Sequence, residues 1–185
     1  MSEIQSIQLD GTTKPAKLIA ALGNPGKEYE HTYHNAGWLF VDFLKNKLGT
    51  KSEKSGHFYK YYKVRDSALL LAEPNELFMN DSGQYIASLL NNLRLKPHEF
   101  ILVHDDSDIP LGSYKLSSGS GSAGHKGVKS VIDALGTKDF MRLRIGIRHK
   151  EGKALDFVLS EIKPAENKIL LETFETIFLE TVKGF

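Results

Sequence analysis

Short apolar runs alternate along this chain with segments of helical periodicity, and this alternation constrains the fold more than any other feature. Residues 17–23 and 100–103 have the apolar character of buried strands, and residues 141–147 alternate as a strand with apolar residues on one side and arginines on the other. Apolar residues recur at helical spacing over residues 35–48 and over residues 82–95. Because alternating strands and helices bury their apolar faces in layers, this pattern predicts an α/β fold. We expect a single-domain, three-layer sandwich in which helices flank a mixed, mostly parallel sheet.

Further elements are expected between and after these segments. Residues 57–64 and 68–72 alternate as two strands, with a short hairpin link between them. The first of these strands is rich in aromatic residues, which we interpret as one buried face rather than as a base-stacking surface. Helices are expected over residues 128–135 and 164–182. The polar residues of the last helix are more acidic than basic, which makes it a poor surface for RNA.

Length and composition exclude several classes of protein. A chain of 185 residues suits one domain, and we expect residues 1–15 to form a flexible tail before a domain at 16–185. No apolar run approaches the ~18 residues that span a bilayer, and the polar N-terminus lacks the apolar middle of a secretory signal. The chain has no cysteine, which fits a cytoplasmic location. Because the net charge is only +1, any nucleic-acid surface must be a local cluster of basic residues.

Four short polar segments interrupt the apolar elements and carry the candidate chemistry. They are residues 23–26 together with 34–35, residues 79–80, residues 104–108 and residues 124–127. Three of them follow expected strand ends or precede expected helices. Ligands of open α/β sheets bind in the crevice beyond the carboxyl ends of the strands. We therefore expect these segments to form one site.

The residue types in these segments suit the attack of water on an acyl group. A neutral histidine can accept a proton near pH 7, and a carboxylate on its other nitrogen fixes the tautomer and stabilises the imidazolium. Asparagine amides can position the water and donate to a developing oxyanion. The chain has neither a cysteine nor the Gly-x-Ser-x-Gly motif, so nothing points to a thiol or serine nucleophile.

Five longer motifs stand out along the chain. The first is GNPGxxYxxTxHNAG at residues 23–37, and the second is FMNDSG at residues 78–83. The third is HDDSDIPLG at residues 104–112. The fourth is GHKGVKS at residues 124–130, and the fifth is RLRIGI at residues 142–147. In order and spacing, these motifs closely resemble the signatures of bacterial-type peptidyl-tRNA hydrolases.

This resemblance implies an activity and a role for particular residues. The family hydrolyses the ester bond between peptide and tRNA, and His34 would be its general base on water. Asp105 would hold His34, while Asn24 and Asn80 would place the terminal peptide residue and the water. His125 would line the same cleft. The residues expected to bind substrate or tRNA are Tyr29, Phe78, Met79, Asn80, His125, Lys126, Lys115 and Arg144.

The resemblance also implies what accompanies the enzyme. The partner would be the acceptor stem and 3′ end of peptidyl-tRNA, and Lys115 and Arg144 would meet its phosphates. The family needs no metal or other cofactor and is usually monomeric, so we expect no obligate protein partner and no membrane. The chain departs from the family at Tyr33, where arginine is usual, at Lys126, where asparagine is usual, and at Ser117, commonly basic. We expect Lys126 to supply the phosphate contact that Ser117 lacks.

Alternative interpretations concern the same segments. The chain could be a non-catalytic RNA-binding protein that has kept the hydrolase fold. The acidic residues at 105–108 lack the glycine of a calcium loop, because Pro110 interrupts the pattern, and we expect Asp106 to be a solvated charge. His104 should face away from the site, since strand neighbours point oppositely. His149 should be exposed. The glycine-rich stretch at 119–126 is interpreted as a flexible lid.

Overall fold

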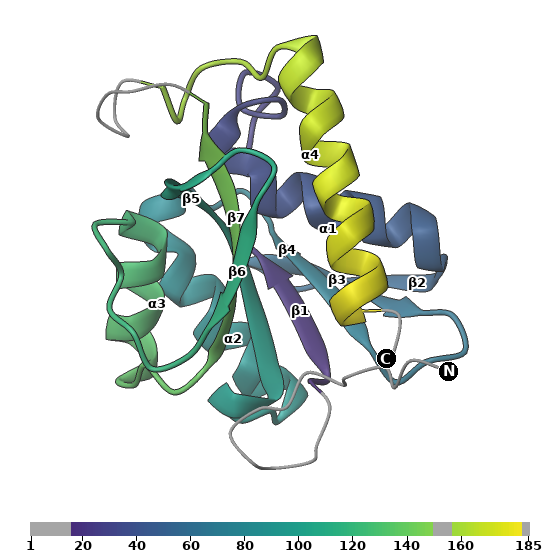
Figure 1. Cartoon of the computed structure of the whole chain (residues 1–185). Helices are drawn as coiled ribbons and strands as arrows, with labels where there is room; N and C mark the ends of the chain where they lie inside the picture. Colours follow the sequence, from purple (N-terminus) through teal and green to yellow (C-terminus); the bar gives the residue numbers. More distant parts are fainter. Residues whose placement is uncertain (1–15, 150–156, 183–185) are drawn as a thin grey trace.

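The computed structural model describes residues 16–149 and 157–182, and a seven-stranded mixed sheet lies at its centre (Figure 1). The strand order is β2-β3-β4-β1-β5-β7-β6. The four central strands β4, β1, β5 and β7 are parallel, while β2, β3 and β6 form antiparallel pairs at the two edges. The strands are β1 Leu18–Ala21, β2 Thr50–Ser55, β3 Tyr59–Val64, β4 Leu70–Pro74, β5 Phe100–Pro110, β6 Tyr114–Ser117 and β7 Met141–Arg148. The tail expected at residues 1–15 lies outside the described residues.

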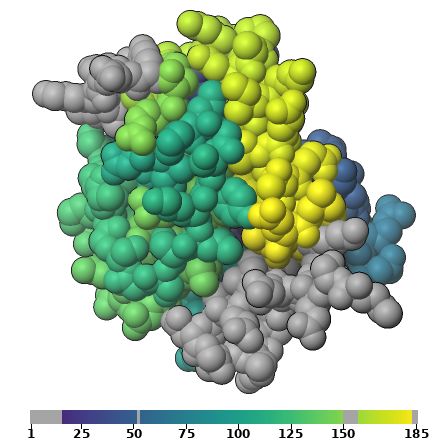
Figure 2. Space-filling model, viewed as in Figure 1, coloured from purple at the N-terminus to yellow at the C-terminus, as the bar shows by residue number. Residues whose placement is uncertain are grey.

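Helices cover both faces of the sheet, which confirms the predicted sandwich. Helices α1 (Ala36–Leu48) and α4 (Pro164–Ile177) lie on one face. Helices α2 (Ser82–Leu93) and α3 (Lys126–Leu135) lie on the other. Figure 2 shows α4 as a continuous ridge along the surface of the molecule. Within the described residues, no helix combines the length and apolarity that crossing a membrane requires. Short helical turns complete the chain: η1 Tyr33–Asn35, η2 Met79–Asp81, η3 Pro97–Glu99 and the π-helical η5 Phe178–Val182.

The central strand β1 contributes to two separate cores. Leu18 and Ala20 pack into the core beneath α2 and α3, whereas Ile19 and Ala21 pack into the core beneath α1 and α4. All four side chains are fully buried. A parallel strand covered by helices on both faces needs apolar residues on both sides, which explains the uninterrupted apolar run.

A crevice opens where β1 ends and its neighbour continues. The pairing of β1 with β5 stops at Ala21 and Val103. Strand β5 runs on to Pro110, paired with β7 at Asp105 and Asp106. The chain leaves β1 through α1 on one face and enters β5 from α2 on the other. The end of β1 is therefore a topological switch point, where ligand sites of α/β sheets form.

Three strands of the sheet, β5, β2 and β6, differ from the prediction, whereas the aromatic strand β3 agrees with it. Strand β5 is longer than the expected residues 100–103, because its polar second half stays paired with β7. The edge strands β2 and β6 were not predicted, since most of their described side chains are polar and exposed and show no apolar alternation. The aromatic strand was predicted correctly, because Tyr59 and Tyr61 of β3 are buried in the core beneath α2.

Candidate functional site

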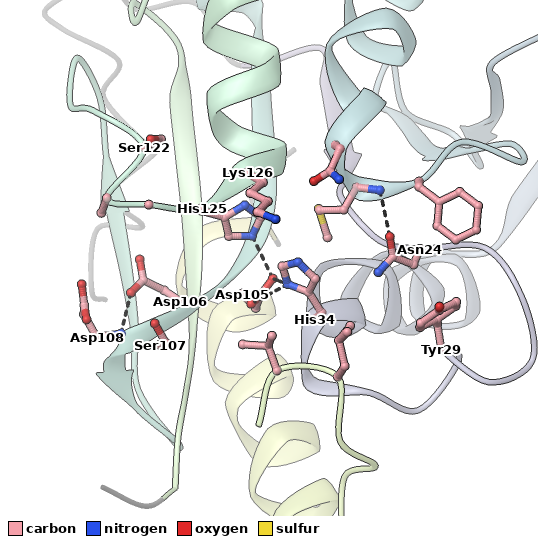
Figure 3. A pocket seen from close by; sticks show the side chains of 17 residues that line it. Asn24, Tyr29, His34, Asp105, Asp106, Ser107, Asp108, Ser122, His125 and Lys126 are labelled. Carbon is pink, nitrogen blue, oxygen red and sulfur yellow. Dashed lines mark hydrogen bonds and ion pairs between the residues drawn. The ribbon is translucent and has the colours of Figure 1, made fainter. Parts of the chain in front are cut away.

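His34 lies at the centre of the crevice and is bonded to a buried carboxylate. It belongs to η1, the turn between β1 and α1. Its Nδ1 atom is 2.9 Å from Asp105 Oδ1 and 3.0 Å from Asp105 Oδ2 (Figure 3). Close packing makes this reach possible, because a side chain at Gly37 would place its Cβ 2.6 Å from the Val103 carbonyl oxygen. Since Nδ1–H donates to Asp105, the lone pair of Nε2 is left for a proton from water.

A second histidine donates to the same carboxylate. His125 Nε2 is 3.0 Å from Asp105 Oδ1, and the rings of His34 and His125 lie 5.0 Å apart. The Nδ1 atom of His125 caps α3 by accepting a hydrogen bond of 3.3 Å from the Val128 backbone N–H. An acceptor at Nδ1 leaves the proton on Nε2, so the helix cap fixes the tautomer that donates to Asp105.

The surroundings of Asp105 and of His34 shift the pKa of each group. Burial opposes the charged form of Asp105, but His34 and His125 outweigh burial and hold the pKa of this carboxyl well below its usual range. Burial also opposes the charged form of His34, yet attraction and hydrogen bonding to Asp105 raise its pKa above the ordinary 6.5. The nearby ammonium of Lys126 acts in the opposite direction on the pKa of His34. The site therefore keeps Asp105 ionised and makes His34 more basic.

Asn24 is held rigidly at the end of β1. The Asn35 side chain forms two hydrogen bonds to the Asn24 backbone. Its Oδ1 atom accepts from Asn24 N–H at 2.8 Å, and its Nδ2 atom donates to Asn24 O at 3.0 Å. The Met79 backbone N–H donates to Asn24 Oδ1 at 2.8 Å. Because its oxygen is occupied, Asn24 is left to present its NH₂ group, a hydrogen-bond donor, to the crevice (Figure 3).

These side chains line one cavity of about 500 Å³. All four predicted catalytic residues line this cavity: Asn24, His34, Asn80 and Asp105. Asn80 is exposed on the cavity wall, and no hydrogen bond among the described residues joins it to the other three. Tyr29 and Phe78 contact each other edge-on at a centroid distance of 6.1 Å. The cavity is lined by Asn24, Tyr29, His34, Phe78, Met79, Asn80, Asp105, Asp106, Ser107, Asp108, Ser122, Ala123, Gly124, His125, Lys126, Val158 and Leu159.

Two predicted tRNA contacts lie outside this lining. Lys115 and Arg144 face each other in register across β6 and β7. Arg144 Nε donates to Asp106 Oδ2 at 2.7 Å, and Asp106 Oδ1 accepts from the Asp108 backbone N–H at 2.9 Å. Asp106 is only 7% exposed, so its assignment as a solvated charge is wrong. The reason is that β5 continues past Asp106 beside β7, which brings the guanidinium to the carboxylate.

Two other histidines lie close to the site. His104 does not line the cavity, as expected for a side chain that faces away from it, and its buried ring packs edge-on against His125 at 4.9 Å. Its Nδ1–H donates to the Asp105 carbonyl at 2.7 Å, and burial lowers its pKa well below the usual range. His149 was expected to be exposed, but it is half-buried and stacks on Tyr33 at 4.6 Å.

The glycine-rich stretch is hydrogen-bonded to strand β7. Arg142 of β7 is buried and donates to the carbonyl oxygens of Gly121 and Ser120, each at 3.0 Å. The residues that follow, from Ser122 to Lys126, line the cavity. Arg142 thus links the loop to the sheet just before the segment that carries His125.

The two histidines and the carboxylate they share, His34, His125 and Asp105, form a group that could hold a metal ion. The ligand atoms of His34, Asp105 and His125 lie within 4.8 Å of one another, alone among groups of three in the described residues. Both nitrogen–oxygen distances to Asp105 Oδ1 are ordinary hydrogen-bond lengths. Proton donation by the two imidazoles therefore accounts for the arrangement.

Several residues that line the cavity or support its lining were not named from the sequence as functional. Asn35 appeared only as part of the first motif, and its spacing from Asn24 gave no sign of the two bonds between them. Val158 and Leu159 come from the segment before α4, which carries no polar motif. Their position beside His34 could not be read from the sequence, because the backbone bond from His34 N to Val158 O spans distant parts of the chain.

An α/β sandwich with a histidine–carboxylate pair and an amide donor at its switch point has the groups that suit a hydrolase. A family model described as peptidyl-tRNA hydrolase matches residues 18–183. The chain is 38% identical to the peptidyl-tRNA hydrolase of Lactobacillus gasseri, over 91% of this chain and 94% of that protein. It is 40% identical to the one from Aquifex aeolicus, over 86% and 84%. The chain belongs to the peptidyl-tRNA hydrolase family.

The solved structures agree with this assignment. Peptidyl-tRNA hydrolase from Acinetobacter baumannii superposes on the chain with a TM-score of 0.79. The two are 29% identical, and the match covers 91% of this chain and 89% of the other. The agreement therefore extends across most of the fold.

Proposed function

We propose that this chain hydrolyses peptidyl-tRNA, cutting the ester bond between the peptide and the terminal ribose to release free peptide and tRNA. Membership of the family supports the reaction. The observation that carries the proposal is the His34–Asp105 pair, which lies in a cavity open enough to admit a chain end. Such a reaction recycles tRNA from interrupted translation.

His34 is the general base in this proposal. Its Nε2 atom takes a proton from water while the water oxygen bonds to the ester carbonyl carbon. Asp105 holds Nδ1–H and stabilises the imidazolium as it forms. The imidazolium then returns the proton to the departing ribose oxygen as the carbon–oxygen bond breaks, so the enzyme ends the cycle unchanged.

The asparagines serve the water and the acyl group. Asn24 offers an NH₂ donor whose position is fixed by Asn35 and by the Met79 backbone. A preorganised donor stabilises the oxyanion of the tetrahedral intermediate without reorganisation. Asn80 lies on the cavity wall next to Met79, from which its amide places the terminal peptide residue.

Basic residues would position the tRNA through its phosphates. Lys126 lies exposed at the cavity wall, directly beside His125. Lys115 and Arg144 lie side by side across β6 and β7, and the partly exposed Arg144 is already oriented by Asp106. Phosphate contacts fix the register of a nucleic acid without reading its bases, which suits an enzyme that accepts many tRNAs. We further propose that the protein acts in the cytoplasm as a monomer, without a metal, another cofactor or an obligate protein partner.

One assay separates this proposal from a non-catalytic RNA-binding protein with the same fold. The pure protein is mixed with purified peptidyl-tRNA, and free peptide and tRNA are measured over time. The proposal requires both products to be released with an intact tRNA chain at many turnovers per enzyme molecule. Binding of peptidyl-tRNA without release would establish the RNA-binding alternative.

A further inference from the structure

A buried tyrosine next to the catalytic histidine links the site to the N-terminal end of α4. Tyr33 precedes His34 in η1, and its side chain is 1% exposed. Its hydroxyl donates to Glu166 Oε2 at 2.6 Å. Its ring stacks on His149 at 4.6 Å with an interplanar angle of 10°, and meets Phe157 edge-on at 6.1 Å. One side chain therefore contacts the end of β7, the segment before α4, and α4 itself.

The carboxylate that receives this hydroxyl is itself fixed in place. Glu166 lies in the first turn of α4, and its Oε2 atom also accepts from the Lys163 backbone N–H at 3.1 Å. It caps the helix, and the bonds from Tyr33 and Lys163 together lower its pKa against the effect of burial. A capping carboxylate is an anchor of well-defined position, because its place is set by the helix end.

The backbone on both sides of Tyr33 is hydrogen-bonded to the segment that leads into α4. His34 N–H donates to the Val158 carbonyl at 2.8 Å, and Ile162 N–H donates to the His31 carbonyl at 2.8 Å. The catalytic turn is thus bonded along the chain that leads into α4. Asp105 approaches His34 from the sheet, so the imidazole is held between two supports: its own turn on the α4 side and the carboxylate on β5.

We propose that Tyr33 is a positioning residue for the hydrolase reaction, which holds His34 against Asp105 through its hydroxyl bond to Glu166. This inference rests on the proposed function. Packing alone does not require the hydroxyl, since phenylalanine would stack equally well on His149. The hydroxyl adds a directed bond to a fixed anchor, one residue away from the general base. Small displacements of a catalytic group are costly, because about 1 Å of misplacement reduces rates by up to ~10²-fold.

The test compares Tyr33→Phe with a matched control, Tyr62→Phe. Tyr62 also donates its hydroxyl to a buried carboxylate, Glu73, at 2.7 Å, but it lies on β3 outside the cavity lining. We expect Tyr33→Phe to lower kcat about tenfold with KM changed less than twofold, whereas Tyr62→Phe changes kcat less than twofold. Thermal unfolding verifies that both variants are folded.

Two further readouts distinguish positioning from a general structural role. The titratable groups that face His34 are Asp105, His125 and Lys126. If Tyr33→Phe loosens the bond to Asp105, the acidic limb of kcat/KM moves to lower pH, while Tyr62→Phe leaves it in place. Adding Glu166→Ala to Tyr33→Phe should lower kcat no further than Glu166→Ala alone, because both changes break one bond.

The outcomes separate this inference from the proposed function. If the unaltered enzyme releases no peptide, the proposed function fails. If it does, and Tyr33→Phe has the kcat and pH limb of the unaltered enzyme, the positioning role is refuted. Equal losses of kcat in Tyr33→Phe and Tyr62→Phe would also refute it, since they would reflect a general loss of stability.

Discussion

Replacing Asp105 by asparagine tests the electrostatic core of the site. The substitution keeps the shape of a side chain that is 2% exposed, but it removes the negative charge to which His34 and His125 both donate. At an effective dielectric constant of about 20, unit charges about 4 Å apart interact by ~4 kcal/mol. Loss of that stabilisation from the imidazolium in the transition state corresponds to a fall in kcat of about 10³-fold.

The assay is kcat for peptide release from saturating peptidyl-tRNA, with Asp106→Asn as the control. Asp106 is the next residue and is also buried, but its carboxylate pairs with Arg144 rather than with an imidazole. We expect Asp106→Asn to lower stability and to change kcat less than about tenfold. If the folded Asp105→Asn variant lost no more kcat than Asp106→Asn, the role of Asp105 as orienter of His34 would be refuted.

Two other changes test separate parts of the site. The raised pKa of His34 predicts that kcat/KM rises with pH at a midpoint above 6.5. Because the Lys126 ammonium opposes protonation of His34, Lys126→Asn should move that midpoint to higher pH. An unchanged midpoint would contradict this effect of Lys126 on His34. The same variant should raise KM and reduce the slope of log affinity against log salt by about one, whereas unchanged affinity and slope would place Lys126 in solvent. Asn35→Ala removes both bonds to the Asn24 backbone, so chemical denaturation should show a loss of ~1–3 kcal/mol together with a lower kcat; a loss of stability at unchanged kcat would show that Asn24 needs no clamp.

The central strands and the four main helices could be predicted because burial leaves a periodic trace in the sequence. Strand β1 is covered on both faces and is therefore uniformly apolar. The edge strand β2, Thr50–Ser55, has no such trace, since its pairing with β3 and not its side chains makes it a strand. The second half of β5 was missed for a similar reason: residues 104–108 are polar because they form the site, although they remain in the ladder with β7.

The candidate site was predictable as a set of residues but not as a network. The motifs brought His34, Asp105 and Asn24 to one crevice, and the structure places all three there. The second imidazole on Asp105 could not be predicted, because it depends on which way His125 points at the start of α3. The burial of Asp106 depends in the same way on the position of Arg144 across the sheet. Such contacts are set by side-chain direction between distant elements, which spacing along the chain does not encode.

The central claim is that His34, held by Asp105, activates the water that cleaves peptidyl-tRNA. The most direct test is single-turnover peptide release by excess enzyme, which excludes product release from the measured rate. The unaltered protein and His34→Ala are compared at equal substrate occupancy, after the fold of each has been verified. We expect His34→Ala to bind peptidyl-tRNA with little change and to release peptide at least ~10²-fold more slowly. Release by the folded variant at a rate close to that of the unaltered protein would contradict the account.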